Sequence, residues 1–235
     1  MKNICLAILF LTFGGYSFAN QPFNRLQQQT TKNNKLSDDS QKDKKAEDIL
    51  NGVSKKYKSY KSVKATFVIT MENPNDKSKD VQKGTICLKG SKYKLNVAGQ
   101  DVISDGKTRW TYVKDANEVQ IDNQKTDENT ITPSNIFTMY EKGFLFKFMG
   151  EQNEKGMTYQ LVELIPVDPK KKNVFKVKLT INKNDKFIVS AKLFDKNGGV
   201  QTIAVDKMTP DVCSDDSIFS FTSQKYPGAE IIDLR

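Results

Sequence analysis

The sequence contains no histidine among its 235 residues. Histidine is the commonest general base, the usual partner of serine and cysteine nucleophiles, and a frequent metal ligand. No glycine-rich phosphate-binding loop is present either. The remaining carboxylates lie mostly in expected turns or on the wet faces of expected strands. The sequence therefore gives no support for an enzyme, and we expect no catalytic residue, no cofactor and no metal.

Cysteine is also scarce, with three residues in the chain. Cys5 lies in the apolar N-terminal run, which leaves Cys87 and Cys213 for the working protein. These two lack the spacing of metal ligands. In an oxidising compartment they can form a disulfide, and they can equally be small buried residues within strands. Of these two readings we expect the second.

Long apolar runs are almost absent. The exception is residues 4–13, which follow Lys2 and precede the small residues Ser17 and Ala19. This run is too short to span a bilayer, and its flanks are typical of a signal peptide. We expect residues 1–19 to be a signal peptide cleaved after Ala19. No later stretch approaches the length of a membrane span, so we expect an exported protein that does not span the membrane.

The charge is unbalanced, because 37 Lys and Arg residues stand against 28 Asp and Glu residues, a net charge of +9. The lysines are spread through the expected strands, and the densest run, at 170–172, lies in an expected loop. Aromatic residues do not alternate with these lysines as they do on a base-stacking surface. We therefore expect no nucleic-acid partner.

After the apolar run, a polar stretch is followed by a stretch in which apolar residues recur periodically. Residues 20–43 are rich in Gln, Asn, Lys, Asp and Thr, which predicts a flexible polar leader. From 46 to 60 the apolar residues recur every three or four positions, which predicts an amphipathic helix. The residues of this stripe are Ile49, Leu50, Val53 and Tyr57. We expect a single domain over residues 44–235.

Beyond Lys61 the apolar period becomes two, which is typical of strands with one dry face. The run from Val63 to Met71 is the clearest example. Short turns such as Asp105-Gly106, which favours a two-residue hairpin turn, separate the runs and indicate antiparallel neighbours. The sequence therefore predicts an antiparallel meander of about ten or eleven strands.

The meander is interrupted at about 132–149, where Thr132 and Pro133 can begin a short helix of about 133–142. This insert is dense in aromatic and methionine side chains, which adapt to ligands of variable shape. We expect it to be a lid.

Two short helices are too few to cover ten strands, so the sheet is expected to close partly on itself. The fold class expected is mainly β, an incomplete antiparallel β-barrel with an N-terminal helix and a helical lid over an apolar cavity. The pattern alone leaves open a solid sandwich core. The candidate cargo-binding residues are Phe67, Ile69, Tyr93, Leu95, Trp110, Tyr112, Ile136, Phe137, Tyr140, Phe144, Phe148, Phe175 and Val177.

Several short motifs, in order, carry a family resemblance over about 46–233. They include Tyr60-Lys61-Ser62-Val63-Lys64-Ala65-Thr66-Phe67, Ile103-Ser104-Asp105-Gly106-Lys107-Thr108-Arg109-Trp110-Thr111-Tyr112, Thr132-Pro133, Asp195-Lys196-Asn197-Gly198-Gly199 and Tyr226-Pro227-Gly228-Ala229-Glu230. With these motifs the chain resembles the LolA family, periplasmic carriers of outer-membrane lipoproteins.

The resemblance implies a periplasmic monomer that shelters the acyl chains of lipoproteins in its apolar interior. Its partners would be an inner-membrane release complex and an outer-membrane receptor. Many members of that family carry an arginine, which latches the lid, where this chain has Lys89; Lys89 is therefore the latch candidate. The alternative is a LolA-like module that binds another lipid or glycolipid, or that senses envelope stress.

Overall fold

The computed structural model describes residues 43–74, 77–124, 138–141 and 143–235. The expected signal peptide at 1–19 and all of the expected leader except Asp43 lie outside these ranges. Residues 42–235 form one compact unit. Within it the helices are α1 (Lys44–Lys58) and the short 3-10 helices η1 (Met139–Glu141), η2 (Pro169–Lys171), η3 (Asp216–Phe219) and η4 (Ser223–Lys225).

Twelve strands in the described residues form one sheet, in the order β12-β6-β5-β4-β3-β2-β1-β11-β10-β9-β8-β7. Their bounds are β1 (Val63–Asn73), β2 (Ser78–Lys89), β3 (Lys92–Val97), β4 (Gln100–Ser104), β5 (Thr108–Val113), β6 (Glu118–Asn123), β7 (Phe144–Glu154), β8 (Met157–Pro166), β9 (Val174–Asn182), β10 (Phe187–Asp195), β11 (Val200–Pro210) and β12 (Glu230–Asp233).

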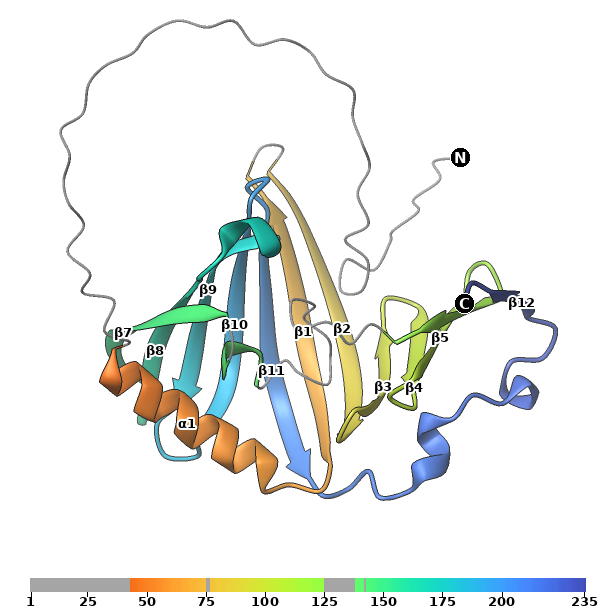
Figure 1. Cartoon of the computed structure of the whole chain (residues 1–235), viewed down its shortest axis with the longest axis horizontal. Helices are drawn as coiled ribbons and strands as arrows, with labels where there is room; N and C mark the ends of the chain where they lie inside the picture. The colour runs from red at the N-terminus through yellow and green to blue at the C-terminus, as the bar shows by residue number, and fades with distance from the viewer. Residues whose placement is uncertain (1–42, 75–76, 125–137, 142) are drawn as a thin grey trace, which may run out of the picture. The chain divides into compact units, whose positions relative to one another are not determined.

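The sheet is open, with β7 and β12 at its two edges, and it curls around the side on which α1 lies (Figure 1). All neighbouring strands are antiparallel except β12, which pairs in parallel with β6. The expected incomplete antiparallel barrel is therefore confirmed, with one strand more than the upper estimate. The additional parallel strand comes from the C-terminal residues, which return to the β6 edge.

Helix α1 forms where the stripe of apolar residues predicts it and begins two residues earlier. The Asp43 carboxylate caps it, since Oδ1 accepts hydrogen bonds from the backbone N–H groups of Lys45 and Ala46 at 3.0 and 3.1 Å. The stripe is buried, as expected, and α1 contacts β7 and β10. In Figure 1 the helix crosses the strands at the β7 end of the sheet.

The turn before Trp110 is one residue longer than expected. It consists of Asp105, Gly106 and Lys107, with Gly106 at a φ of +94°. Asp105 Oδ1 accepts hydrogen bonds from the N–H groups of Lys107 and Thr108 at 2.8 and 2.7 Å. Asp105 and Gly106 thus have the turn roles that their residue types predict, in a three-residue loop.

The expected lid insert, 132–149, is corrected in part. Residues 144–149 form the first half of the edge strand β7, because Phe144, Phe146 and Phe148 alternate with Leu145, Lys147 and Met149 in the manner of a strand. Residues 139–141 form η1. Residues 132–137 lie outside the described ranges.

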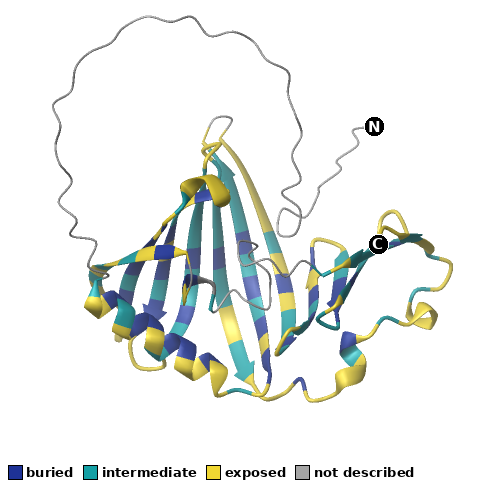
Figure 2. Cartoon of the chain, in the orientation of Figure 1, coloured by how far each residue is buried: buried dark blue, intermediate teal, exposed yellow. Residues whose placement is uncertain are grey.

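The two faces of the sheet differ. We call the face that carries α1 the inner face and the opposite one the outer face. Along most strands buried positions alternate with exposed or partly exposed ones, as Figure 2 shows by colour. None of the helices in the described ranges has the length and apolarity needed to cross a membrane.

Candidate functional site: the apolar inner face

Six apolar side chains form a continuous row across the inner face. Because residues directly opposite one another in a ladder share a face, the row can be followed from strand to strand. It crosses β7, β8, β9, β10, β11 and β1, in the order Phe148, Val162, Leu179, Ala191, Ile203 and Ile69. The row itself contains no charged side chain; five of its members are buried, and Lys45 of α1 lies over the sixth, Phe148.

A second apolar row continues from β1 toward β4. It consists of Ala65, Ile86, Leu95 and Val102. Between the two rows, Phe67 of β1 lies opposite Gly84 of β2, and its ring occupies the space that a side chain at position 84 would need. Glycine is therefore required there so that the ring of Phe67 can lie flat on the inner face.

Helix α1 and η1 are held against the β7 end of this face by specific contacts. Tyr140 donates a hydrogen bond to the carbonyl oxygen of Leu50 at 3.1 Å. The Phe148 backbone N–H donates to Asp43 Oδ2 at 2.8 Å, which lowers the pKa of that carboxyl group. Lys45 Nζ lies 3.9 Å from the centroid of the Phe148 ring. These contacts place α1 directly over the aromatic positions of β7.

The inner face becomes polar at its β5 and β6 end. The row that begins with Val63 and Leu88 continues through Tyr93 and then through Ser104, Arg109 and Asp122. Arg109 is only 5% exposed, and its Nη2 lies 2.6 Å from Asp122 Oδ2. Its Nε is buried and has no hydrogen-bond partner among the residues that the structure describes. This end of the face can therefore accept a hydrogen-bonding group as well as apolar surface.

Tyr93 lies where the apolar and polar parts of the row meet. Its ring is fully buried, and its hydroxyl donates to Gln124 Oε1 at 3.0 Å. Burial raises the pKa of Tyr93 to about 12, although the nearby positive charge of Arg109 acts in the opposite direction. The tyrosine is thus neutral over the whole range in which the protein is expected to work.

Trp110 and Tyr112 do not lie on the inner face, although the sequence pattern aims them at the apolar interior. Both belong to the outer face, because Arg109 and Thr111 take the inner positions of β5. The Trp110 ring stacks on Phe221 with centroids 6.2 Å apart, and the Tyr112 ring lies 4.6 Å from that of Tyr226. These aromatic residues attach the C-terminal segment, residues 211–229, to the outer face of β4–β6.

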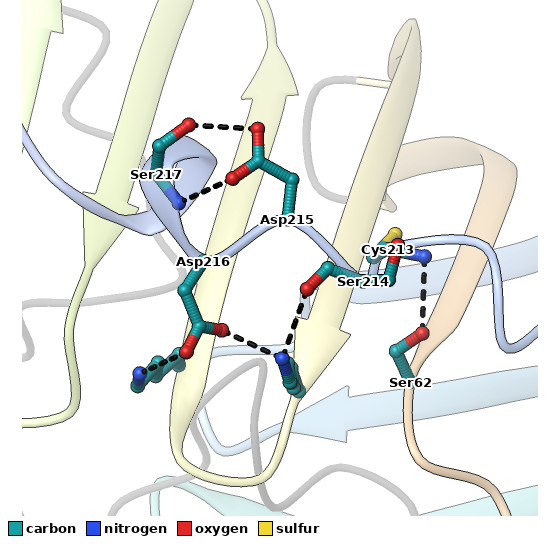
Figure 3. Close-up of polar contacts among 8 residues, drawn as sticks. Ser62, Cys213, Ser214, Asp215, Asp216 and Ser217 are labelled. Carbon is teal, nitrogen blue, oxygen red and sulfur yellow. Dashed lines mark hydrogen bonds and ion pairs between the residues drawn. The ribbon is translucent and has the colours of Figure 1, made fainter.

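The expectation for the cysteines is corrected as well, since Cys87 and Cys213 form a disulfide with a Cα–Cα distance of 6.1 Å. Cys87 lies on the outer face of β2, opposite Lys64 of β1. Cys213 lies beyond the end of β11 and not in a strand, and its N–H donates to Ser62 Oγ at 3.0 Å (Figure 3). The chain after β11 leaves the strand and brings Cys213 next to Cys87. The periodicity of the strands does not predict this contact.

Lys89 holds the same segment. Its Nζ donates to the carbonyl oxygen of Ser214 at 3.0 Å and to Asp216 Oδ1 at 2.7 Å. Lys92 contacts the other oxygen of Asp216 at 3.2 Å. Figure 3 shows Asp216 and Ser214 turned toward these two amines. The described partners of Lys89 thus belong to the C-terminal segment. Its expected role as a latch on residues 132–149 stays a prediction, because residues 132–137 lie outside the described ranges.

Phe175 is also an outer-face residue. The β9–β10 ladder is irregular at this point, because Phe194 pairs with Lys176 and the next residue of β10, Asp195, pairs with Val174. This bulge leaves Phe175 unpaired and turns it outward, where its ring lies 6.1 Å from that of Phe194. Val177 remains on the inner face.

Most of the remaining predicted cargo-binding residues lie on the inner face. The inner face carries Phe67, Ile69, Tyr93, Leu95, Phe144, Phe148 and Val177, and Tyr140 is buried in η1. Ile136 and Phe137 lie outside the described residues. In β8 the buried positions include Val162 and Leu164. Inner-face residues that are not among the predicted candidates include Ile86, Val102, Arg109, Asp122, Val162, Leu164, Leu179, Ala191 and Ile203.

The other surfaces are weaker candidates for a functional site than the inner face. A shallow polar groove beside α1 is lined by Asn51, Ser54, Lys55, Lys58, Ser59 and Glu141. Lys58 Nζ lies 2.6 Å from Glu141 Oε1 within it. Across the ranges that the structure describes, no group of three or more cysteine and acidic residues is arranged to hold a metal ion. The apolar inner face is therefore the candidate functional site.

Several solved structures resemble this chain to different degrees. An uncharacterized conserved protein from Thermus thermophilus has a TM-score of 0.51 at 13% identity, over 80% of this chain and 99% of that chain. Lipoprotein LppX of Mycobacterium tuberculosis has a TM-score of 0.44 at 12% identity, over 74% and 100%. The MucA/MucB complex of Pseudomonas aeruginosa gives 0.40 at 11%, over 77% and 62%. Comparison with curated protein sequences gives no match.

A family model provides the assignment. The model described as "Outer membrane lipoprotein carrier protein LolA" matches residues 36–195. This range is more than half of the chain and contains α1 and the strands β1 to β10, including most of the inner face. The C-terminal segment with Cys213 lies beyond it. The chain therefore belongs to the LolA family of outer membrane lipoprotein carrier proteins.

Proposed function

We propose that this protein is a periplasmic carrier that binds the acyl chains of lipoproteins on its inner face and transfers them from the inner to the outer membrane. The observation that carries the proposal is the uninterrupted apolar row from Phe148 of β7 to Ile69 of β1. Membership of the LolA family supports the same cargo.

The energetics explain why such a face is needed. Each acyl methylene removed from water is worth about 0.8 kcal/mol, so lipid chains require cover to cross an aqueous compartment. An apolar wall without directional contacts supplies this free energy for chains of different length. It also permits release, because no specific hydrogen bond has to be broken along the apolar row.

The expected setting follows from the same proposal. The Cys87–Cys213 disulfide suits an oxidising compartment such as the periplasm, and the pattern of residues 1–19 supports export through a signal peptide. The protein acts as a monomer, without a cofactor and without catalysis. An inner-membrane complex loads it and an outer-membrane receptor accepts the cargo.

The test is extraction of a lipoprotein from membranes. Vesicles that carry a fluorescently labelled lipoprotein and the inner-membrane release complex are incubated with the purified protein. We expect the label to move into the soluble fraction in a 1:1 complex with the protein. A lipoprotein without its acyl chains is the control and remains unbound. If the acylated form also stays in the membrane, lipoprotein transfer is excluded.

A second candidate is favoured by one observation, the contact between buried Arg109 and partly exposed Asp122 at the polar end of the inner face. A lipoprotein acyl chain needs no such group, whereas a glycolipid or another lipid with a polar head could use the unpartnered Arg109 Nε. The chain would then be a lipid-binding or envelope-stress-sensing module. Retention of glycolipid but not of acylated peptide, in a competition experiment with both, would favour this candidate.

A further inference from the structure

The outer face of β7–β10 carries a surface unlike the rest of the sheet, which we call the outer corner. One line of it contains the cross-strand pairs Leu145–Ile165 and Lys176–Phe194. The adjacent line runs through Lys147, Glu163, Lys178 and Lys192. Apolar and basic side chains thus lie in neighbouring lines across four strands.

Three of these lysines converge on one aromatic ring. The Nζ atoms of Lys176, Lys192 and Lys178 lie 4.9, 5.7 and 5.9 Å from the centroid of Phe194. The negative face of an aromatic ring attracts ammonium groups, so Phe194 gathers three like charges into a small area. An anion bound between them would relieve their mutual repulsion.

The positive charge here is only partly balanced. Glu163 lies in the line of lysines, and its Oε2 is 4.0 Å from Lys176 Nζ. Lys147 and Lys178, on either side of Glu163, are exposed. The corner therefore keeps a net positive charge at neutral pH, in a protein whose total formal charge is +9.

Apolar side chains are exposed next to these charges. Leu145 is 40% exposed, Ile165 is 42% exposed and Phe175 is 46% exposed. Leu145 and Ile165 are direct cross-strand partners, and Phe175 lies against Phe194. Isolated exposed leucines are ordinary, but two exposed apolar pairs beside a group of lysines indicate a surface that binds a partner.

We propose that the outer corner docks the protein onto an anionic phospholipid membrane surface. Lysine stems can extend so that their ammonium groups reach lipid phosphates, while Leu145, Ile165 and Phe175 enter the interface between headgroups and acyl chains. A lipid surface adapts to the outside of a curled sheet and needs no complementary pocket. An acidic protein would satisfy the lysines but leave the exposed apolar group without an equivalent environment.

The inference is independent of the cargo. The row that would hold acyl chains lies on the inner face, and Leu145, Lys178 and Lys192 lie on the outer one. Membrane docking and cargo binding can therefore be measured separately, and either can fail alone.

The experiment is flotation of the purified exported protein with vesicles of pure phosphatidylcholine or of phosphatidylcholine mixed with phosphatidylglycerol. We expect binding to the anionic vesicles only, weakened by high salt because exposed charges are screened. A lysine near an anionic surface strengthens binding by roughly fivefold, so Lys178→Glu/Lys192→Glu should weaken it by about 25-fold or more.

The matched control is Lys64→Glu/Lys83→Glu, which makes the same charge change at two exposed outer-face positions of β1 and β2. It should retain most of the binding, and circular dichroism should show that all variants are folded. Leu145→Ser/Phe175→Ser should remove the part of the binding that resists salt. Failure of the unmodified protein to float, or equal losses for the two lysine pairs, overturns the proposal.

Discussion

Tyr93 contacts both the apolar and the polar part of the inner face. Its ring extends the apolar row of Val63 and Leu88, and its hydroxyl belongs to the polar group that includes Gln124. Because the ring is buried, ionising the phenol would place a charge in a poorly solvated position. This is the cause of its raised pKa of about 12.

The raised pKa makes stability depend on pH in the alkaline range. In the unfolded chain Tyr93 ionises near pH 10, whereas in the folded protein it stays neutral until about pH 12. Its contribution is therefore complete below pH 10 and is lost as the pH rises to 12. Two pKa units correspond to at most about 2.7 kcal/mol.

We therefore expect Tyr93→Phe to reduce the alkaline loss of stability. Urea unfolding at several pH values between 8 and 12 would give the free energy of unfolding of both proteins. The curve of the variant should fall less steeply above pH 10. Tyr159→Phe, on the outer face of β8, is the control and should reproduce the curve of the unmodified protein; two identical variant curves would contradict this assignment.

At the scale of elements, the C-terminal segment is a strap on the outer face. The disulfide, the contacts of Lys89 and Lys92 with Asp216, and the stacking of Trp110 on Phe221 hold it in place. The segment leads into β12, which pairs in parallel with β6. The edge of the sheet is then β12 itself, a strand of only four residues, and very short edge strands limit association with other chains.

The disulfide should supply most of this attachment. The cysteines are 126 positions apart, and crosslinking a loop of that size restricts the unfolded chain strongly. We expect Cys87→Ser/Cys213→Ser to lower the free energy of unfolding by about 2–5 kcal/mol. Trp110 is the only tryptophan, and it lies under the C-terminal segment on the outer face of β5. Its fluorescence should shift to longer wavelength when the segment detaches and water reaches the ring.

A matched comparison separates the covalent link from the ion pair. Lys89→Met leaves the disulfide intact and removes a partly exposed contact, which is worth about 1 kcal/mol or less. It should change the emission of Trp110 little. A red shift as large as that of the double cysteine variant would mean that the ion pair, and not the disulfide, holds the strap.

At the scale of the whole molecule, much of the fold follows from periodicity and turn chemistry. The α1 stripe, the alternation in β1 and the glycine turns predict a helix and an open antiparallel sheet, and these are present. The assignment of faces fails where it relies on aromatic content. The size and apolarity of Trp110 predict an interior position, although Arg109 has the inner position.

The register of β2 to β5 predicts the correct face for Arg109 and therefore for Trp110. The turn at Gly90 and Ser91 places Leu88 opposite Tyr93, and the next two hairpins place Tyr93 opposite Ser104 and Ser104 opposite Arg109. Stepping through these turns puts Arg109 on the face of Tyr93. The disulfide and the bulge at Phe175 could not be obtained in this way, because each depends on a local departure from strand geometry.

The two faces of the sheet should therefore have separable functions, and two phenylalanines allow a direct test. Phe148 of β7 is partly exposed on the inner face, and Phe194 of β10 is partly exposed on the outer face. Replacing either by serine removes the same side chain. Phe148→Ser deletes apolar surface in the proposed cargo row, a loss of about 1.5–3 kcal/mol and so roughly 10- to 100-fold in affinity for an acylated peptide.

Phe194→Ser leaves the cargo row intact and releases the three lysines from their common ring. It should bind the acylated peptide like the unmodified protein and bind anionic vesicles more weakly, whereas Phe148→Ser should do the reverse. Fluorescence titration and vesicle flotation of both variants measure the two effects. Parallel losses in both assays would show that cargo and membrane share one surface, and the division of labour between inner and outer face would then be wrong.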